Sequence, residues 1–413
     1  MRVLFDHQAF IMQKIGGISR CFAELYRHFP NDGKVHICLK ETENLYALNQ
    51  NIAHHYNYDH DHFICSRRFP FKGRLFRSSY RFIGYTGDYY DKLSYNQFYS
   101  IRKLQTGNFD IFHPTYYDDY FLSYLNDKPF VLTIHDMIPE LFPQYFDIND
   151  FQILQKRKLA PLASAIIAVS ENTKQDIVRI LNVPPEKVHV VYHGCSFSKI
   201  MHANRLISSP YILFVGERGG YKNFTLFVKH IASTLKKHPE IMVVCTGRAF
   251  EKSEIQMFAN QNLQNRFIHC EIKTDNEFYS LYHFAICFVY PSQYEGFGIP
   301  ILEAYKSDCL VLLNRASCFP EIAGDAAVYF TISEEQSTIA EQFEYIYSMT
   351  QFERERQLQK QRIQLAKYSW ENSARQLSDI YKNILNSKQN ETLNHHQLNK
   401  NNAKTQYHNS HIQ

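Results

Sequence analysis

Short apolar stretches alternate with amphipathic stretches over most of the chain. In the first half, the apolar stretches predict buried strands at residues 3–5, 35–39, 111–112, 130–134, 165–169 and 188–192. A second series follows at residues 211–215, 241–245, 284–290, 310–313 and 327–330. Short strands separated by helical segments are typical of βαβ units, whose parallel sheets are covered by helices on both faces. The pattern therefore predicts an α/β fold with two Rossmann-like, doubly wound domains.

The periodic pattern stops near residues 195–209, where Ser, His, Asn and Pro replace it. At 413 residues the chain is long enough for two hydrophobic cores, since single cores rarely grow past roughly 250 residues. We expect an N-terminal domain at 1–200 and a C-terminal domain at 201–370.

The end of the chain divides into a helical part and a polar tail. Residues 354–385 have a helical pattern, and Ser369 or Asn372 is a candidate cap for its last segment. Asn, Gln and His make up 14 of the 27 residues at 387–413. Such a composition buries too little apolar surface to offset the entropy of ordering, so we expect a disordered tail.

Charge and cysteine content limit the partners and the compartment. The net charge of +4 is too small by itself to indicate a nucleic-acid partner, and we expect none. The nine cysteines form no CxxC pair, and several lie in apolar stretches, as is typical of buried thiols in a reducing compartment. The sequence shows neither a signal peptide nor a long apolar span, so we expect a cytoplasmic protein.

One basic and aromatic segment departs from this picture. Residues 63–81 carry six basic side chains, among them Arg67, Arg68, Lys72 and Arg74, with no acidic residue between them. Basic and aromatic residues together favour an anionic membrane surface or a lipid-linked phosphate. We expect peripheral contact with the inner face of the cytoplasmic membrane, or with the acceptor. A solvated loop is the alternative.

The most informative stretch is residues 290–303, Tyr-Pro-Ser-Gln-Tyr-Glu-Gly-Phe-Gly-Ile-Pro-Ile-Leu-Glu. A predicted strand ends in a loop with Gly296 and Gly298, and Pro300 stands where the first helical turn begins. The positive end of that helix favours phosphate. Glu295 and Glu303 flank this cradle, and each carboxylate is an acceptor for sugar hydroxyls.

This arrangement resembles glycosyltransferase family 4, which comprises retaining enzymes of the GT-B fold. The resemblance rests on Glu-x7-Glu around Gly296-Phe297-Gly298-Ile299-Pro300 and covers most of residues 1–385. It implies two Rossmann-like domains facing a deep interdomain cleft, with the helix at 371–386 packing back on the N-terminal domain. The segments at residues 135–140 and 218–223 are similar to those of bacterial surface-polysaccharide enzymes of O-antigen or capsule synthesis, several of which transfer mannose.

The loop after the strand at 211–215 supplies candidate cations. A pyrophosphate leaving group gains negative charge as the glycosidic bond breaks, and Arg218 and Lys222 can neutralise that charge. Gly216 lets this loop lie against the ligand. The family carries an Arg and a Lys at this place, although their spacing varies.

Two further positions match the family in the first half. Gly16, Gly17 and Arg20 follow the first strand, where the family has a glycine-rich loop beside donor phosphate or acceptor. A plain tight turn is the alternative. His135 ends a buried strand, where the family has a histidine that meets the donor sugar. Asp136 either orients His135 or caps the next element.

The resemblance implies how these residues act together. Arg218 and Lys222 hold the diphosphate together with residues 296–299, Glu303 holds the ribose, and Glu295 and His135 contact the hexose. We expect the acceptor to be a glycan that is linked to a lipid. The departing phosphate takes the proton of the acceptor hydroxyl. No cofactor or metal is required, and Asp59-His60-Asp61, which matches a metal motif of another glycosyltransferase fold, lies in a polar loop.

Two alternatives remain at this point. One is another GT-B-like enzyme acting on sugar nucleotides, such as an epimerase or a phosphorylase. The other is a noncatalytic sugar-nucleotide binder. The presence of both glutamates with Arg218, Lys222 and His135 argues against the binder.

Overall fold

The computed structural model describes the backbone of residues 1–55, 87–200 and 202–409, and the side chains of 1–55, 95–200 and 202–390. Within these ranges the chain forms two compact units. Unit 1 comprises residues 1–133, 158–167 and 374–413, and unit 2 comprises 134–157 and 168–373. None of the helices in the described part combines the length and apolarity needed to cross a bilayer.

Unit 1 contains a parallel sheet of order β2-β1-β5, formed by β1 (Arg2–Phe5), β2 (Lys34–Ile37) and β5 (Ile111–His113). A second small sheet pairs β3 (Glu41–Thr42) with β4 (His54–His55). The helices of this unit include α1 (Gln8–Met12), α2 (Gly17–Arg27), α3 (Leu45–Asn49), α5 (Gly87–Gln105) and the 3-10 helix η2 (Tyr120–Tyr124).

A third sheet has the order β6-β7-β8 and consists of β6 (Val131–Ile134), β7 (Ala165–Ala168) and β8 (Val188–Val190). An isolated parallel bridge joins Phe112, in β5, to Phe130, just before β6. The intervening elements are α6 (Ile138–Leu141), α7 (Phe151–Leu159), α8 (Glu171–Leu181) and the 3-10 helix η3 (Pro185–Lys187). The six strands predicted for the first half are all present in these sheets.

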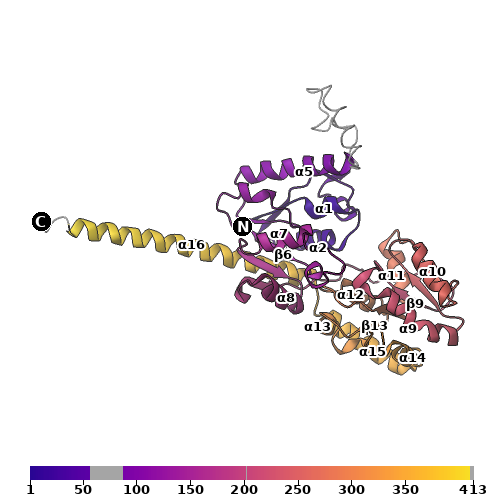
Figure 1. Ribbon diagram of the computed structural model, residues 1–413. Helices are drawn as coiled ribbons and strands as arrows, with labels where there is room; N and C mark the ends of the chain where they lie inside the picture. Colours follow the sequence, from indigo (N-terminus) through magenta and orange to yellow (C-terminus); the bar gives the residue numbers. More distant parts are fainter. Residues whose placement is uncertain (56–86, 201, 410–413) are drawn as a thin grey trace, which may run out of the picture. The chain divides into compact units, whose positions relative to one another are not determined.

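Unit 2 contains a parallel six-stranded sheet of order β11-β10-β9-β12-β13-β14. Its strands are β9 (Tyr211–Phe214), β10 (Met242–Cys245), β11 (Phe267–His269), β12 (Cys287–Tyr290), β13 (Val311–Asn314) and β14 (Val328–Phe330). Its helices, which Figure 1 shows around β9 and β13, include α9 (Phe224–Lys237), α10 (Lys252–Asn260), α11 (Asp275–His283), α12 (Ile299–Lys306), α13 (Phe319–Ala323), α14 (Ile339–Tyr347) and α15 (Gln351–Leu365). Two 3-10 helices, η4 (Gly220–Lys222) and η5 (Gly324–Ala326), complete it.

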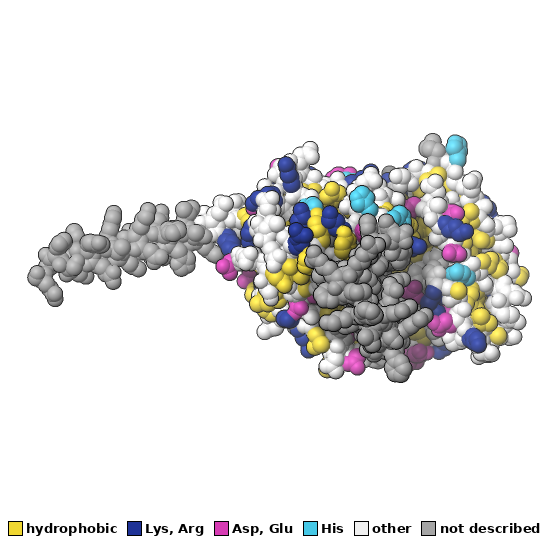
Figure 2. Space-filling view, turned by 90° about the horizontal axis from the view of Figure 1, so that it is seen from above, with side chains coloured by type: hydrophobic (Ala, Val, Ile, Leu, Met, Phe, Trp, Pro, Cys, Tyr) yellow, Lys and Arg dark blue, Asp and Glu magenta, His cyan; other side chains and the backbone are white. Residues whose placement is uncertain are grey.

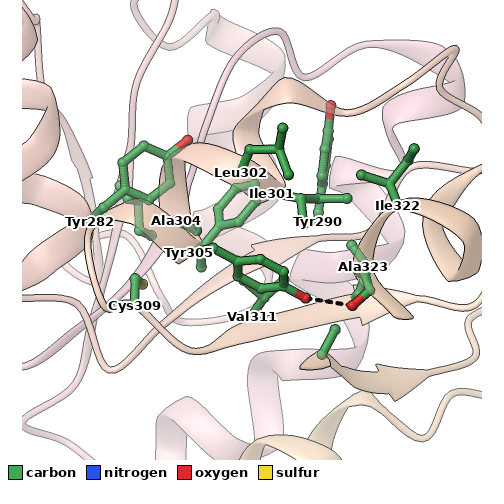
Figure 3. Packing of buried hydrophobic residues seen from close by; sticks show 14 of the residues in the cluster. Tyr282, Tyr290, Ile301, Leu302, Ala304, Tyr305, Cys309, Val311, Ile322 and Ala323 are labelled. Carbon is green, nitrogen blue, oxygen red and sulfur yellow. Dashed lines mark hydrogen bonds between the residues drawn. The ribbon is translucent and has the colours of Figure 1, made fainter. Parts of the chain in front are cut away.

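Both faces of this sheet are buried, because successive side chains of a strand point to opposite faces. In β9, Tyr211 and Leu213 belong to one hydrophobic cluster, whereas Ile212 and Phe214 belong to the other. Figure 3 shows part of the first cluster, in which the Tyr305 hydroxyl donates to the carbonyl of Ala323 at 3.0 Å. The near-continuous apolar strands of the sequence are thus explained by helices on both faces, and the predicted fold class is confirmed.

Two sequence predictions of secondary structure are incomplete or wrong. Strand β11 was not predicted, because Phe267–His269 is a short edge strand with one buried residue and no long apolar run. The single helix expected over 354–385 is instead broken between α15 and α16 (Trp370–Asn409). The Ser369 hydroxyl accepts a hydrogen bond from the backbone N–H of Asn372 at 3.2 Å, so Ser369 caps α16.

Helix α16 begins in unit 2, belongs to unit 1 from Ala374 onward and continues to Asn409 (Figure 1). The Tyr381 hydroxyl lies 2.5 Å from Nδ1 of His113, and Lys382 pairs with Asp32 at 2.6 Å. The helix therefore runs through much of the polar tail for which the composition predicts disorder.

The two units do not meet at a single boundary near residue 200, where the sequence places the domain boundary. Residues 134–157 and 168–200 precede that position but belong to unit 2.

Basic, acidic and hydrophobic side chains are interspersed over the described surface of the face in Figure 2. This mixture agrees with the small net charge of +4.

Candidate functional site in unit 2

The sheet order of unit 2 contains a topological switch point. Counted from β9, the strands follow the order 3-2-1-4-5-6, so the connections leave β9 and β12 in opposite directions. Ligands of open parallel sheets bind at the carboxyl ends of the strands beside such a reversal. Here the loops after β9 and after β12 occupy that place, and they carry most of the predicted donor-binding residues.

An ion pair joins these two loops. Nζ of Lys222, after β9, lies 2.6 Å from Oε1 of Glu295, after β12, and both side chains are less than a fifth exposed. Burial opposes the charged form of Lys222, but Glu295 and Tyr221 outweigh it and raise the Lys222 pKa above its ordinary value. The structure therefore brings together two predicted site residues that lie 73 positions apart in the sequence.

The loop before α12 is shaped by its two glycines for different reasons. Gly298 precedes the helix with φ +90°, a left-handed conformation that favours glycine. A Cβ on Gly296 would lie 1.8 Å from the carbonyl oxygen of His135, so only glycine permits this approach. The Gly296 carbonyl also accepts hydrogen bonds from the hydroxyls of Ser170 at 2.6 Å and Thr173 at 3.1 Å. Gly296 thus closes the loop against the backbone of His135, and its contact with a ligand stays a prediction.

His135 consequently stands beside the loop that carries Glu295. Its ring centroid lies 6.0 Å from that of His193, and the ring of His193 packs against Phe297 at 4.9 Å. Burial, assisted by the positive charge of Lys156, lowers the pKa of His135 to about 4. A neutral His135 is therefore the dominant form near pH 7. Asp136 accepts a hydrogen bond from the backbone N–H of Ile138, the first residue of α6, at 3.0 Å.

A buried ion pair supports this strand end. Nζ of Lys156 lies 2.7 Å from Oε2 of Glu140 and donates to the carbonyl of Asp136 at 3.1 Å. The two side chains are 0% and 2% exposed. Lys156 was not predicted, because its position in a helical stretch with other basic residues gives no sign of burial.

Glu303 lies on α12, and its side chain turns toward the interior of unit 2. The Tyr282 hydroxyl donates to Oε2 of Glu303 at 3.2 Å. Burial, followed by the charge of Glu303, raises the Tyr282 pKa well above its ordinary value. Figure 3 shows Tyr282 in the same hydrophobic cluster as Leu302 and Ala304, the neighbours of Glu303 in α12. Tyr282 is a further residue that the sequence did not single out.

Arg218 has a different environment from the one predicted. Its guanidinium pairs with Glu254 at 2.7 Å and donates to the carbonyls of Thr246, Arg248 and Ala249 at 2.6–3.0 Å. Arg218 is 3% exposed. In this conformation Arg218 connects the loop after β9 to α10. Its contact with a diphosphate stays a prediction. Gly216, in the same loop, has φ +97° and open space around an added Cβ.

The predicted glycine-rich loop of the first half belongs to unit 1. Gly16 precedes α2 in an extended conformation, and a Cβ on Gly17 would meet nothing within 4 Å. Arg20 is 7% exposed, and its guanidinium lies 5.4 Å from the centre of the Tyr46 ring. Arg20 therefore packs against α3 of its own unit.

The remaining predicted residues fall outside the described part of the chain. These are Arg67, Arg68, Lys72 and Arg74 of the basic segment, together with Asp59-His60-Asp61. Within the described ranges, no group of three or more His, Cys, Asp or Glu side chains is placed to hold a metal ion. The expectation that no metal or cofactor is required stays a prediction.

The buried histidines predict how stability depends on pH. Burial lowers the pKa of His135 to about 4 and that of His193 to about 3, both below the 6.5 of an unfolded chain. Above about pH 6.5 the two histidines leave the free energy of unfolding unchanged. Below that pH the free energy of unfolding falls by about 1.4 kcal/mol per pH unit for each histidine, because the unfolded chain takes up a proton that the folded chain does not. Urea unfolding between pH 7 and 5 measures this slope. His193→Asn is expected to reduce it, whereas exposed His202→Asn leaves it unchanged. Equal slopes for both variants contradict the assignment.

The parallel sheets and the switch-point loops are those of the GT-B fold. The solved structure of Anabaena HepE in complex with UDP and glucose matches with a TM-score of 0.65 at 17% identity, covering 93% of this chain and all of that one. Residues 15–199 match the Glycosyltransferase Family 4 profile, and residues 199–365 match that of Glycosyl transferases group 1. The chain therefore belongs to the glycosyltransferases that combine these two parts.

Two relatives are mannosyltransferases. The chain is 27% identical over 206 residues to the O-antigen chain mannosyltransferase RfbU of Salmonella typhimurium. This match covers 50% of this chain and 58% of that protein. It is 26% identical over 269 residues to the O-antigen chain mannosyltransferase B of Escherichia coli, covering 61% and 70%. The first match thus spans little more than half of its relative's length.

Proposed function

We propose that this chain transfers a hexose, mannose as the first candidate, from a nucleoside-diphosphate sugar to a growing surface glycan. The observation that carries the proposal is the Lys222–Glu295 pair at the switch point, at 2.6 Å, next to the start of α12. A cation, a carboxylate and a helix N-terminus are the groups that a diphosphate sugar requires. The two mannosyltransferase relatives support the choice of sugar.

In the proposed reaction, Lys222 and the backbone amides at the start of α12 bind the diphosphate. Glu295 leaves Lys222 to accept hydrogen bonds from the hexose hydroxyls, and Glu303 accepts them from the ribose. The bond between the anomeric carbon and the β-phosphate oxygen breaks, and the acceptor oxygen bonds to that carbon with retention. The acceptor proton passes to the departing phosphate. Neutral His135 donates or accepts at the hexose without adding charge.

The acceptor is proposed to be lipid-linked and reached at the inner face of the cytoplasmic membrane. The support for this part is the sequence of residues 63–81, in which basic and aromatic side chains alternate without an acidic residue.

A panel of sugar nucleotides tests the function directly. Purified protein is incubated with GDP-mannose and with UDP- and dTDP-hexoses, each with and without a lipid-linked oligosaccharide acceptor, and nucleotide release is measured. We expect release from one donor that depends on the acceptor, and NMR of the product then assigns the anomer. A donor that is converted to another sugar nucleotide without acceptor indicates an epimerase. Tight donor binding without any turnover indicates a noncatalytic binder.

A further inference from the structure

Aromatic side chains from distant parts of unit 2 gather beside the Lys222–Glu295 pair. The ring of Phe142 lies 6.3 Å from Tyr145 and 5.8 Å from Tyr221, between ring centres. Tyr221 precedes Lys222, whose Nζ lies 5.1 Å from the centre of the Tyr221 ring. Phe142, Tyr145 and Tyr221 are called the aromatic platform below.

The platform is attached to the site on both sides of the switch point. Phe142 also contacts Tyr294, the residue before Glu295, with ring centres 6.2 Å apart. The backbone N–H of Gln293 donates to the Tyr221 carbonyl at 2.8 Å, which ties the loop after β12 to the loop after β9. These contacts place the platform beside Glu295.

The platform is also open to solvent, unlike the aromatic core of unit 2. Tyr145 is 48% exposed, and its ring packs over Gly220, where an added Cβ would lie 3.2 Å from ring atoms. Phe142 and Tyr221 are half-buried. A single exposed aromatic residue is ordinary, but three that adjoin a charged site form a surface suited to a ligand with one apolar face.

We propose that the aromatic platform binds a hexose ring of the acceptor glycan. This inference rests on the proposed function. The face of a hexose presents C–H groups to an aromatic ring, while its hydroxyls require polar partners at the edge. The carboxylate of Asp136, whose charge acts on Tyr221, is a polar group beside the platform. Burial raises the Tyr221 pKa to about 12; the charge of Lys222 acts against this shift, and the charges of Glu295 and Asp136 add to it.

The position of the platform favours the acceptor over the nucleobase of the donor. Under the proposed function, Glu295 marks the hexose end of the donor and Glu303 marks the ribose end. The platform contacts the residues next to Glu295, whereas the aromatic partner of Glu303 is Tyr282, a fully buried residue. The acceptor hydroxyl has to reach the anomeric carbon at the hexose end, so an acceptor ring belongs on the same side.

Saturation-transfer NMR with irradiation of aromatic protons tests the platform without turnover. The probes are the methyl α-glycosides of mannose, glucose, galactose and N-acetylglucosamine. We expect at least one probe to bind, with its dissociation constant rising about fivefold or more in Tyr145→Ala. Tyr145→Phe, which retains the ring, and Tyr345→Ala, whose tyrosine is 53% exposed elsewhere in unit 2, are expected to change it less than about twofold.

The same variants separate the competing outcomes. If Tyr145→Ala weakens GDP and UDP binding but not glycoside binding, the platform binds the nucleobase and the proposal is wrong. The proposal also fails if none of the four probes binds, or if Tyr145→Ala and Tyr345→Ala behave alike. Glycoside binding that depends on Tyr145, with no transfer from any donor in the panel, retains the platform and overturns the proposed function instead.

Discussion

Lys222→Met is expected to lower the kcat of transfer by about 100-fold or more, with the variant still folded. The leaving diphosphate gains negative charge in the transition state, and Lys222 is the cation that pairs with Glu295 at the switch point. Its Nζ lies 2.6 Å from Glu295, in a position where burial makes a charge interaction stronger than in water. Steady-state kinetics with the donor identified in the panel measures the effect.

The same substitution leaves the Glu295 carboxylate without its cation. Because Glu295 is 11% exposed, Lys222→Met is expected to reduce the free energy of unfolding by about 3 kcal/mol. The double variant Lys222→Met/Glu295→Gln removes both charges, so it should regain most of that stability but none of the activity. Lys229→Met, in an exposed pair with Glu334, is the matched control and should change neither quantity. Activity of Lys222→Met within about threefold of the unsubstituted protein contradicts the assignment.

Gly296→Ala is expected to destabilise the protein by about 3 kcal/mol or more. The added Cβ would lie 1.8 Å from the carbonyl oxygen of His135, and that atom is backbone at the end of β6. The loop before α12 then has to move away from His135, and it carries Glu295 with it. We therefore expect loss of stability in urea unfolding together with loss of transfer.

Gly219→Ala is the control for this prediction. Gly219 lies in the other switch-point loop with φ −82°, and an added Cβ meets nothing within 4 Å. The free energy of unfolding of Gly219→Ala is expected to differ from that of the unsubstituted protein by less than about 0.5 kcal/mol. A similar small change for both variants would show that the loop before α12 does not depend on its contact with His135.

The strands that carry the site were predictable because they are buried on both faces. Strands such as β9 and β12 have apolar side chains at every position, and the sequence therefore marks them without alternation. Gly298 was singled out because glycine lets the backbone approach a ligand closely, and the structure adds that its φ is +90°. The short edge strand β11 has no such signal.

The partners of the site residues were not predictable in the same way. Lys222 and Arg218 stand four positions apart and have the same charge, yet one pairs with Glu295 and the other with Glu254. Nothing in the local sequence distinguishes them, because the carboxylates come from other βα units. Gly296 was expected to contact a ligand, and the structure shows that its closest neighbour is the backbone of His135.

The sequence by itself determined the α/β fold, the loop–helix junction at residues 290–303 and the candidate chemistry of two carboxylates and a cation. These features depend on local periodicity and on residue types within a few positions of each other. The tertiary structure alone decided which cation meets Glu295, that Tyr282 faces Glu303, and that Phe142, Tyr145 and Tyr221 adjoin the pair. Such contacts depend on the packing of the whole unit, which brings together loops as far apart in the sequence as those of Phe142 and Tyr294.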